Sequence, residues 1–153
     1  MAKCEKRVYL ILHNIRSAYN VGAIFRTADA AGVSRIYLCG YTPTPANPKV
    51  AKTSLGAENS VAWEKRFSAW RLLEELKSKG MRVIALEQSK YSRDYRHFKP
   101  VFPLAVIIGN EVKGLSPSII KRTDSVWHIP MRGQKESLNV AVAAGVFIYR
   151  ILE

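Results

Sequence analysis

The sequence has few cysteines, and none is placed to build a metal site. Only Cys4 and Cys39 occur among 153 residues, and they form no C-x-x-C pair, so they cannot by themselves supply four zinc ligands. The three histidines, His13, His97 and His128, are scattered along the chain, and their spacing predicts no metal site. We expect both cysteines to be reduced structural thiols of a cytoplasmic protein.

Long apolar runs and nucleotide-binding glycine motifs are also missing. No signal-peptide core follows the charged start of the chain. The apolar run at 104–108 is typical of a buried strand and far shorter than the roughly 20 residues that span a membrane. The sequence contains neither G-x-G-x-x-G after a strand nor G-x-x-x-x-G-K-[ST]. These absences disfavour a membrane protein and a generic nucleotide-binding domain.

Acidic residues are half as numerous as basic ones. The chain has 24 Lys and Arg against 12 Asp and Glu, a formal net charge of +12. That excess predicts attraction to a polyanion such as nucleic acid; the alternative is a basic surface without a partner. The hydrophobic share of 48% suffices for a core, and the length fits a single domain over residues 1–153.

Short apolar runs alternate with longer amphipathic segments. We expect strands at 8–12, 35–39, 82–86, 104–108 and 125–129, and helices at 20–31, 68–79 and 137–152. This alternation predicts an α/β fold, a mostly parallel sheet flanked by helices. Ligands of such sheets bind beyond the carboxyl ends of strands.

Local signals add detail to these elements. Asn20 is expected to cap the first helix and Gly32 to end it. The second helix is expected to point Trp70, Leu73 and Leu76 inward, and the proline-rich segment 42–49 to form a loop.

The last helix is apolar over most of its circumference, so it needs burial on more than one side. A second copy of the chain would supply the extra cover, and the small residues at 141 and 143–145 would permit close approach. The alternative is a helix buried wholly within its own domain.

Three segments carry polar residues where the local pattern would tolerate apolar ones. In 20–32, Arg26 lies opposite the apolar stripe; the alternative is a solvated arginine paired with Asp29. In 107–116 a buried strand ends in a Gly-Asn-Glu turn, which is also compatible with an ordinary strand-to-helix connection capped by Ser116. In 129–140 a glycine loop leads to a helix start, where Ser137 either binds a ligand or merely caps the helix.

In this order and spacing the three segments resemble the TrmH/SpoU family of the SPOUT methyltransferases, which methylate ribose 2′-hydroxyls in RNA. The resemblance covers residues 8–150. The first motif is matched by Asn20, Gly22, Arg26 and Gly32, the second by 109–111 with 114–116, and the third by 129–131 with 137–139.

The resemblance implies S-adenosylmethionine as methyl donor, a C-terminal trefoil knot that binds it, and a homodimer through the C-terminal helix. By position, the expected donor-binding residues are Leu86, Glu87, Gly109, Ile129, Pro130, Met131, Ser137 and Leu138. The resemblance assigns the central catalytic role to Arg26, supported by Asn20, Glu111, Ser137 and Asn139. Because a guanidinium stays protonated to pH above about 12, we expect Arg26 to bind phosphate, orient the ribose and stabilise the developing alkoxide.

Basic residues point to an RNA surface. Segment 90–99 interleaves cations with aromatic rings, a composition suited to phosphates and unstacked bases; alternatively its rings pack onto the domain. The expected RNA-binding residues are Arg16, Lys90, Arg93, Arg96, Lys113, Arg132 and Lys135. The family pattern begins at about residue 7, so we expect no N-terminal RNA-binding domain and a tRNA substrate in preference to rRNA. Competing interpretations are a base-modifying SPOUT enzyme and a non-catalytic RNA-binding or ribosome-assembly module.

Overall fold

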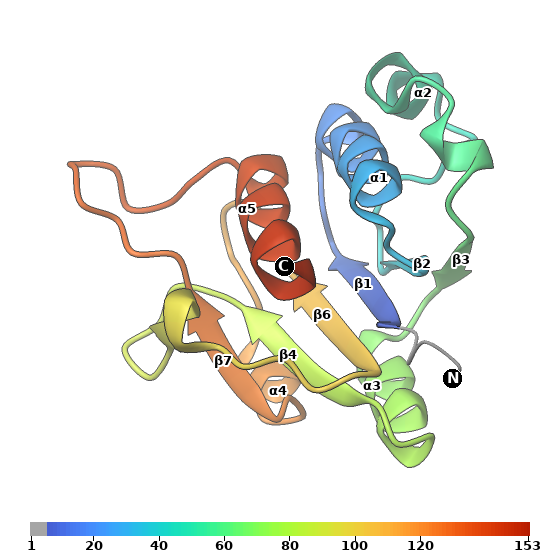
Figure 1. The fold of residues 1–153 in the computed structure, drawn as a ribbon. Helices are drawn as coiled ribbons and strands as arrows, with labels where there is room; N and C mark the ends of the chain where they lie inside the picture. The colour runs from blue at the N-terminus through green and yellow to red at the C-terminus, as the bar shows by residue number, and fades with distance from the viewer. Residues whose placement is uncertain (1–5) are drawn as a thin grey trace.

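The computed structural model describes residues 6–153, whose strands form one sheet (Figure 1). The strand order is β3-β2-β1-β6-β4-β7-β5, and every pairing within the described residues is parallel. The strands are β1 (Val8–His13), β2 (Arg35–Cys39), β3 (Trp63–Arg66), β4 (Arg82–Leu86), β5 (Arg93–Asp94), β6 (Leu104–Ile108) and β7 (Ser125–His128). The expected α/β fold is confirmed, with a sheet that is wholly parallel rather than mostly so.

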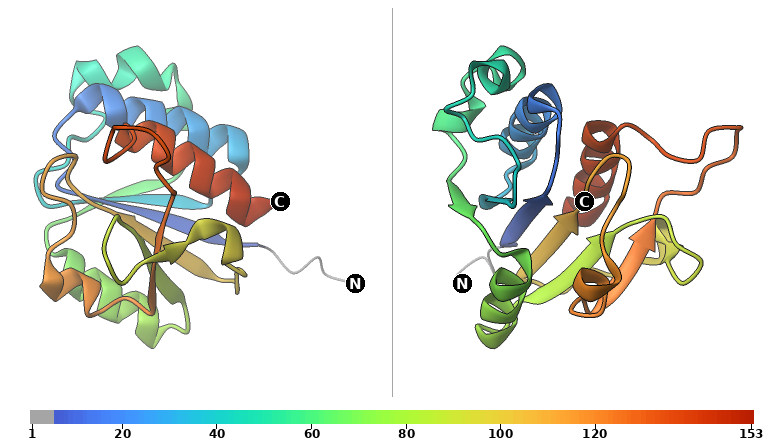
Figure 2. Two further views of the ribbon diagram at one scale, coloured as in Figure 1. Left: turned by 90° about the vertical axis from the view of Figure 1, so that its left-hand side faces the viewer. Right: turned by 180° about the vertical axis from the view of Figure 1, so that it is seen from behind.

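Helices cover both faces of the sheet. Figure 2 shows α1 (Ala18–Ala31), α2 (Pro48–Ser54) and α5 (Val140–Leu152) on one side, with α3 (Ala69–Ser78) and α4 (Pro117–Ile120) on the other. Two 3-10 helices, η1 (Ala57–Asn59) and η2 (Tyr95–His97), lie in the connections. Successive side chains of a strand point to opposite faces, so Leu10 and Leu12 join the α1/α5 core while Ile11 joins the α3/α4 core. All of β6 is buried, which explains its uninterrupted apolar sequence.

Two predicted helix starts were wrong, and both real caps lie close to the predicted ones. Ser17, not Asn20, caps α1, because the Ser17 hydroxyl accepts a hydrogen bond from the Asn20 amide. Asn139, not Ser137, caps α5, with its Oδ1 accepting from Ala141 and Val142. With these caps, the side chains of Asn20 and Asn139 meet in a hydrogen bond where the two helices begin.

The inward face of α3 was partly mispredicted. Leu73 and Leu76 are buried as expected, but Trp70 is 41% exposed. The buried stripe consists of Ala69, Leu72, Leu73 and Leu76, the i, i+3, i+4, i+7 pattern that leaves Trp70 beside the stripe. There Trp70 lies against the guanidinium groups of two arginines, Arg71 and Arg122.

The elements that were not predicted include β3, β5 and α2. The strand β3 carries the sequence WEKR and is an edge strand, so it lacks the apolar run of a covered strand. The helix α2 begins at Pro48 after the cap Asn47, which shortens the expected 42–49 loop.

Cys39 is a free, buried thiol, and burial raises its pKa to about 12. This is the environment of a structural cysteine, whereas Cys4 lies outside the described residues. Among residues 6–153, no helix has the length and apolar character to cross a bilayer.

Candidate functional site

A pocket opens where β4, β6 and β7 end and the chain returns into α5. Its lining residues are Leu86, Glu87, Gln88, Ile108, Gly109, Asn110, Glu111, His128, Ile129, Ser137, Leu138, Val140 and Ala143. All the expected donor-binding residues line it except Pro130 and Met131. Because all strands are parallel, their carboxyl ends converge there, as expected for ligand sites of such sheets.

One wall of the pocket depends on a close approach at Gly109. A Cβ on this residue would lie 2.7 Å from Leu115 Cδ2 and 2.8 Å from the Gly114 carbonyl carbon. Gly114 adopts φ +65°, and a Cβ there would meet the Glu87 carboxylate at 2.4 Å. The strand end and the following turn therefore pack together only because both positions are glycine.

Glu87 ties two walls of the pocket together. Its Oε2 accepts the Leu115 amide at 2.7 Å, and its Oε1 accepts the Gln88 amide at 3.1 Å. Burial raises the pKa of the Glu87 carboxyl, against the smaller lowering effect of these hydrogen bonds. The carboxylate thus fixes the β6–α4 turn against the end of β4.

Asn110 joins three strand ends. Its Nδ2 donates to the Asn14 carbonyl at 3.0 Å and to the Tyr41 hydroxyl at 2.8 Å. Its Oδ1 accepts the amides of Val112 and Lys113. This buried side chain consequently holds the loops after β1, β2 and β6 in one arrangement.

Glu111 anchors the segment that precedes α1. Its two carboxylate oxygens accept the Arg16 and Ser17 amides at 2.9 and 3.0 Å. A carboxylate at this position also suits the positive end of the helix dipole. Glu111 therefore positions the start of the helix that carries Asn20 and Arg26.

The first and third motifs meet at the starts of α1 and α5. Asn139 Nδ2 donates to Asn20 Oδ1 at 3.2 Å, while Ser137 lies in the pocket lining close by in the chain. Asn20, Glu111, Ser137 and Asn139 are thus held in one continuous region around the pocket and the start of α1.

Arg26 lies elsewhere on α1. It comes six residues after Asn20, about 9 Å along the helix axis, and borders a second pocket. That pocket is lined by Ala23, Arg26, Thr27, Ala30, Lys52, Thr53, Leu55 and Tyr149, so it lies between α1, α2 and the end of α5. Within one chain, the structure does not bring Arg26 into the lining of the first pocket.

The expected RNA-binding residues are all exposed, but they differ in their partners. The Arg96 guanidinium is engaged by Asp94, and Arg93 lies over the Trp127 ring at 5.7 Å. Lys90 lies over Tyr91. Figures 1 and 2 show the 129–139 connection, which carries Arg132 and Lys135, projecting away from the sheet.

The aromatic rings of segment 90–99 divide between core and surface. Phe98 packs against Trp127 and Phe147 at centroid distances of 5.0 and 5.8 Å, and Tyr95 also contacts Phe147. Only Tyr91, which is 81% exposed, remains available among the three aromatic residues of this segment.

Further residues of the pocket lining were not among the expected site residues: Gln88, Ile108, His128, Val140 and Ala143, and Asn110 was expected only as part of the second motif. Gln88 and Asn110 follow the ends of β4 and β6 and His128 ends β7, a position that marked them as candidates. Val140 and Ala143 form the first turn of α5, which carries no polar signal. In residues 6–153, no cluster of three or more His, Cys, Asp or Glu side chains is suited to a metal ion.

A family model and curated relatives match this chain over most of its length. Residues 7–149 match the model of the SpoU rRNA Methylase family. The chain is 35% identical over 153 residues to the tRNA (guanosine(18)-2′-O)-methyltransferase of Aquifex aeolicus, covering 97% of this chain and 70% of that protein.

Solved structures show the same fold. An AdoMet-bound rRNA methyltransferase from Sinorhizobium meliloti superposes with a TM-score of 0.89 and 29% identity, over 95% of this chain and 56% of that one. A structure concerned with 2-OH methylation of C/U34 on tRNA gives a TM-score of 0.84 and 28% identity, over 94% and 93% of the two chains.

The chain spans 57 to 70% of the length of the first curated relatives that it matches. The structural matches confirm the SPOUT-type fold with its C-terminal knot. Since the family model extends over nearly all of the described residues, the chain belongs to the SpoU rRNA methylase family.

Proposed function

We propose that this chain transfers a methyl group from S-adenosylmethionine to a ribose 2′-hydroxyl in RNA. One observation carries the proposal: the segments that resemble the second and third family motifs line one pocket, and the first motif is hydrogen-bonded to its rim through Asn20 and Asn139. The net charge of +12 suits an RNA substrate.

The chemistry of the pocket fits this donor. Apolar side chains such as Leu86 and Ile108 offer a surface for an adenine ring, while the carboxylates of Glu87 and Glu111 suit hydroxyl groups and a cationic tail. The donor supplies an activated methyl group, so the protein must orient the ribose oxygen and assist removal of its proton.

Arg26 is the residue that we propose to orient the ribose. A guanidinium binds a phosphate in fixed geometry and stabilises a developing alkoxide, and Arg26 is exposed on the second pocket. Asn20 and Asn139 fix the helix that carries Arg26 relative to the donor pocket.

We further propose that the active form is a homodimer. The exposed apolar residues of α5 and its approach, Leu138, Val142, Val146 and Tyr149, follow one another at helical spacing. Tyr149 also lines the Arg26 pocket, so a second copy bound to this stripe would border Arg26. The arrangement allows one chain's Arg26 to act with the other chain's donor pocket.

We propose tRNA rather than rRNA as the substrate. The structure concerned with C/U34 methylation of tRNA has nearly the same extent as this chain, since the match covers 93% of it.

The test is methyl transfer from radiolabelled S-adenosylmethionine to bulk tRNA and to rRNA, followed by nuclease digestion and mass spectrometry. Appearance of a 2′-O-methylated nucleoside from tRNA supports the proposal; a methylated base or no product overturns it. Arg26→Ala should bind the donor and lose methyl transfer. Arg82 is an exposed arginine at the amino end of β4, away from the pocket, so Arg82→Ala should keep methyl transfer.

A further inference from the structure

Two aromatic side chains stand exposed at the edge of the sheet where the donor pocket opens, but outside that pocket. Tyr41 follows the carboxyl end of β2 and is 57% exposed, and Phe67 follows the carboxyl end of β3 and is 87% exposed. Exposure of such large apolar area is unfavourable in water, by about 25 cal/mol for each Å².

The loops that carry the two rings are tied to each other. The strands β2 and β3 are neighbours, with Cys39 paired to Arg66. Lys65 Nζ, from β3, donates to the carbonyl oxygens of Gly40 and Thr42 on either side of Tyr41. Tyr41 and Phe67 therefore follow the carboxyl ends of two adjacent strands.

Tyr41 is also tied to the donor pocket. Its hydroxyl accepts a hydrogen bond of 2.8 Å from Asn110, which lines that pocket. Asn110 comes from the end of β6, so Tyr41 reaches across the end of β1, the strand between them. Pocket, Tyr41 and Phe67 thus follow one another along the sheet edge.

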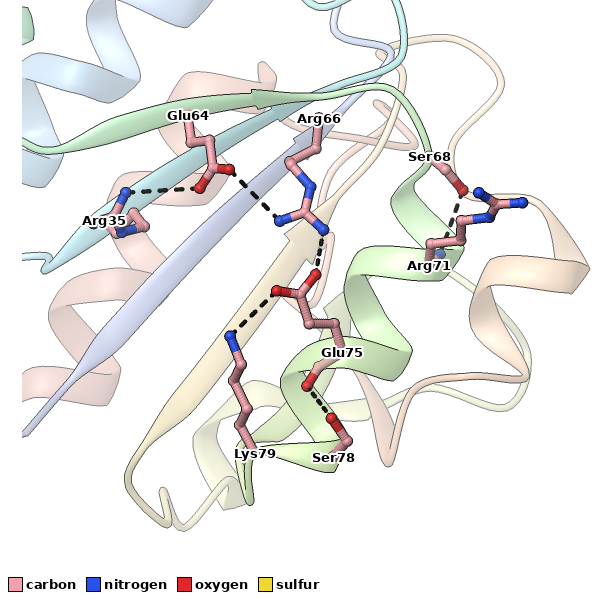
Figure 3. Close-up of polar contacts among 8 residues, drawn as sticks. All are labelled: Arg35, Glu64, Arg66, Ser68, Arg71, Glu75, Ser78 and Lys79. Atoms are coloured by element: carbon pink, nitrogen blue, oxygen red, sulfur yellow. Dashed lines mark hydrogen bonds and ion pairs between the residues drawn. The ribbon is translucent and has the colours of Figure 1, made fainter.

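The exposure of Phe67 is imposed by its neighbours. Figure 3 shows Arg66 held between Glu64 and Glu75, and Ser68 capping α3 through the Arg71 amide. Both flanking residues are anchored, so the Phe67 backbone is fixed while its ring points away from the core.

Charges around the two rings favour one class of partner. The Arg66 cation is engaged by two carboxylates, so the Phe67 end of the surface offers a ring rather than a free guanidinium. Nearer the pocket, the exposed residues Arg16 and Lys113 are held by the Glu111 and Asn110 side chains through their backbone amides. Cations beside the reacting position followed by exposed rings match a single nucleic-acid strand, whose phosphates pair with cations and whose bases stack on aromatic faces.

We propose that Tyr41 and Phe67 form a stacking platform for unpaired RNA bases that flank the nucleotide methylated in the donor pocket. The proposal rests on the proposed function and adds where the neighbouring bases bind. Stacking is tolerant of sequence, since every base has a π-face. The platform selects an unpaired strand over a duplex.

The test measures binding of fluorescently labelled single-stranded oligoadenylate to wild type, Phe67→Ala and Tyr41→Ala by anisotropy. Each variant should lose about tenfold in affinity, as expected for one lost base–aromatic stack. Tyr41→Phe, which keeps the ring but loses the hydroxyl, should bind like wild type. An oligonucleotide of abasic sites keeps the phosphates without the bases, so on it wild type and Phe67→Ala should be equal.

Trp63→Ala is the matched control, because Trp63 is an exposed aromatic at the other end of the same strand, β3. It should leave RNA affinity unchanged. The slope of log affinity against log salt should be the same in Phe67→Ala and wild type, since no phosphate contact is lost.

Unchanged oligoadenylate affinity in Phe67→Ala, or an equal loss with Trp63→Ala, overturns the platform. So does a change of oligomeric state in Phe67→Ala, which would assign the ring to a protein interface. If wild type methylates RNA while Phe67→Ala binds normally, only the platform fails; absence of methylation by wild type is the failure of the proposed function.

Discussion

The side-chain amide of Asn139 donates a hydrogen bond of 3.2 Å to that of Asn20, and the two residues are 119 positions apart in the chain. Asn139 uses its other amide atom, Oδ1, to cap α5. One side chain therefore both begins the C-terminal helix and joins it to the first helix.

Replacing Asn139 with alanine should destabilise the protein by about 1–2 kcal/mol, because the cap of α5 and the bond to α1 are lost together. Denaturant titration measures the change. Asn47→Ala removes the cap of α2 and is the matched control: it should cost about 1 kcal/mol and leave methyl transfer intact. Equal methyl transfer in both variants would contradict a role for Asn139 at the site.

Replacing Gly109 with alanine should weaken donor binding and lower stability by about 1–3 kcal/mol. The new Cβ would come within 2.8 Å of the Gly114 backbone, which cannot rotate away. Calorimetric titration with S-adenosylmethionine and thermal unfolding measure the two effects. Gly133→Ala is the control, since a Cβ there meets nothing within 4 Å. Normal donor affinity in Gly109→Ala would contradict this prediction, because the Gly114 backbone would then have moved to accommodate the new Cβ.

The pH dependence of stability should report on Glu87. Burial raises the pKa of this carboxyl above its ordinary value of 4.5, so the native state holds the proton more tightly than the unfolded chain. The favourable contribution of protonated Glu87 is complete below pH 4.5 and is lost as pH rises through the native pKa. Glutamine does not titrate, so as pH rises through this range the free energy of unfolding of wild type should fall relative to that of Glu87→Gln. Parallel pH profiles of the two proteins in urea titrations would contradict the assignment.

The sequence predicted the parts of the fold that local patterns determine. The buried strand β6 appears as an apolar run because both of its faces are covered, whereas the edge strand β3, with neighbouring strand on one side only, has no such run. The capping residue Ser68 was predicted correctly as a helix start because cap and helix are adjacent in sequence.

Contacts between distant residues could not be predicted in this way. Glu111 accepts the amides of Arg16 and Ser17, more than 90 positions away. This contact accompanies a cap of α1, Ser17, that lies three residues before the expected cap. The separation of Arg26 from the donor pocket depends likewise on how α1 packs against α5. Strand ends and family motifs predicted much of the pocket lining, while Val140 and Ala143 enter it only through the placement of α5.

The last prediction concerns the apolar stripe of α5. Val142 is 53% exposed and Val146 37%, and a buried charge at either position would be strongly unfavourable in a chain–chain interface. Val142→Asp should therefore convert a dimer into a monomer in sedimentation velocity, with loss of methyl transfer if Arg26 acts on the partner's pocket. Val101→Asp is matched in residue type and in its exposed fraction of 53%, but it lies ahead of β6 at the other edge of the sheet, so it should remain dimeric and active. A dimer that survives Val142→Asp would place the interface elsewhere. An aspartate in the centre of an apolar contact would remove most of the affinity of the two chains for each other.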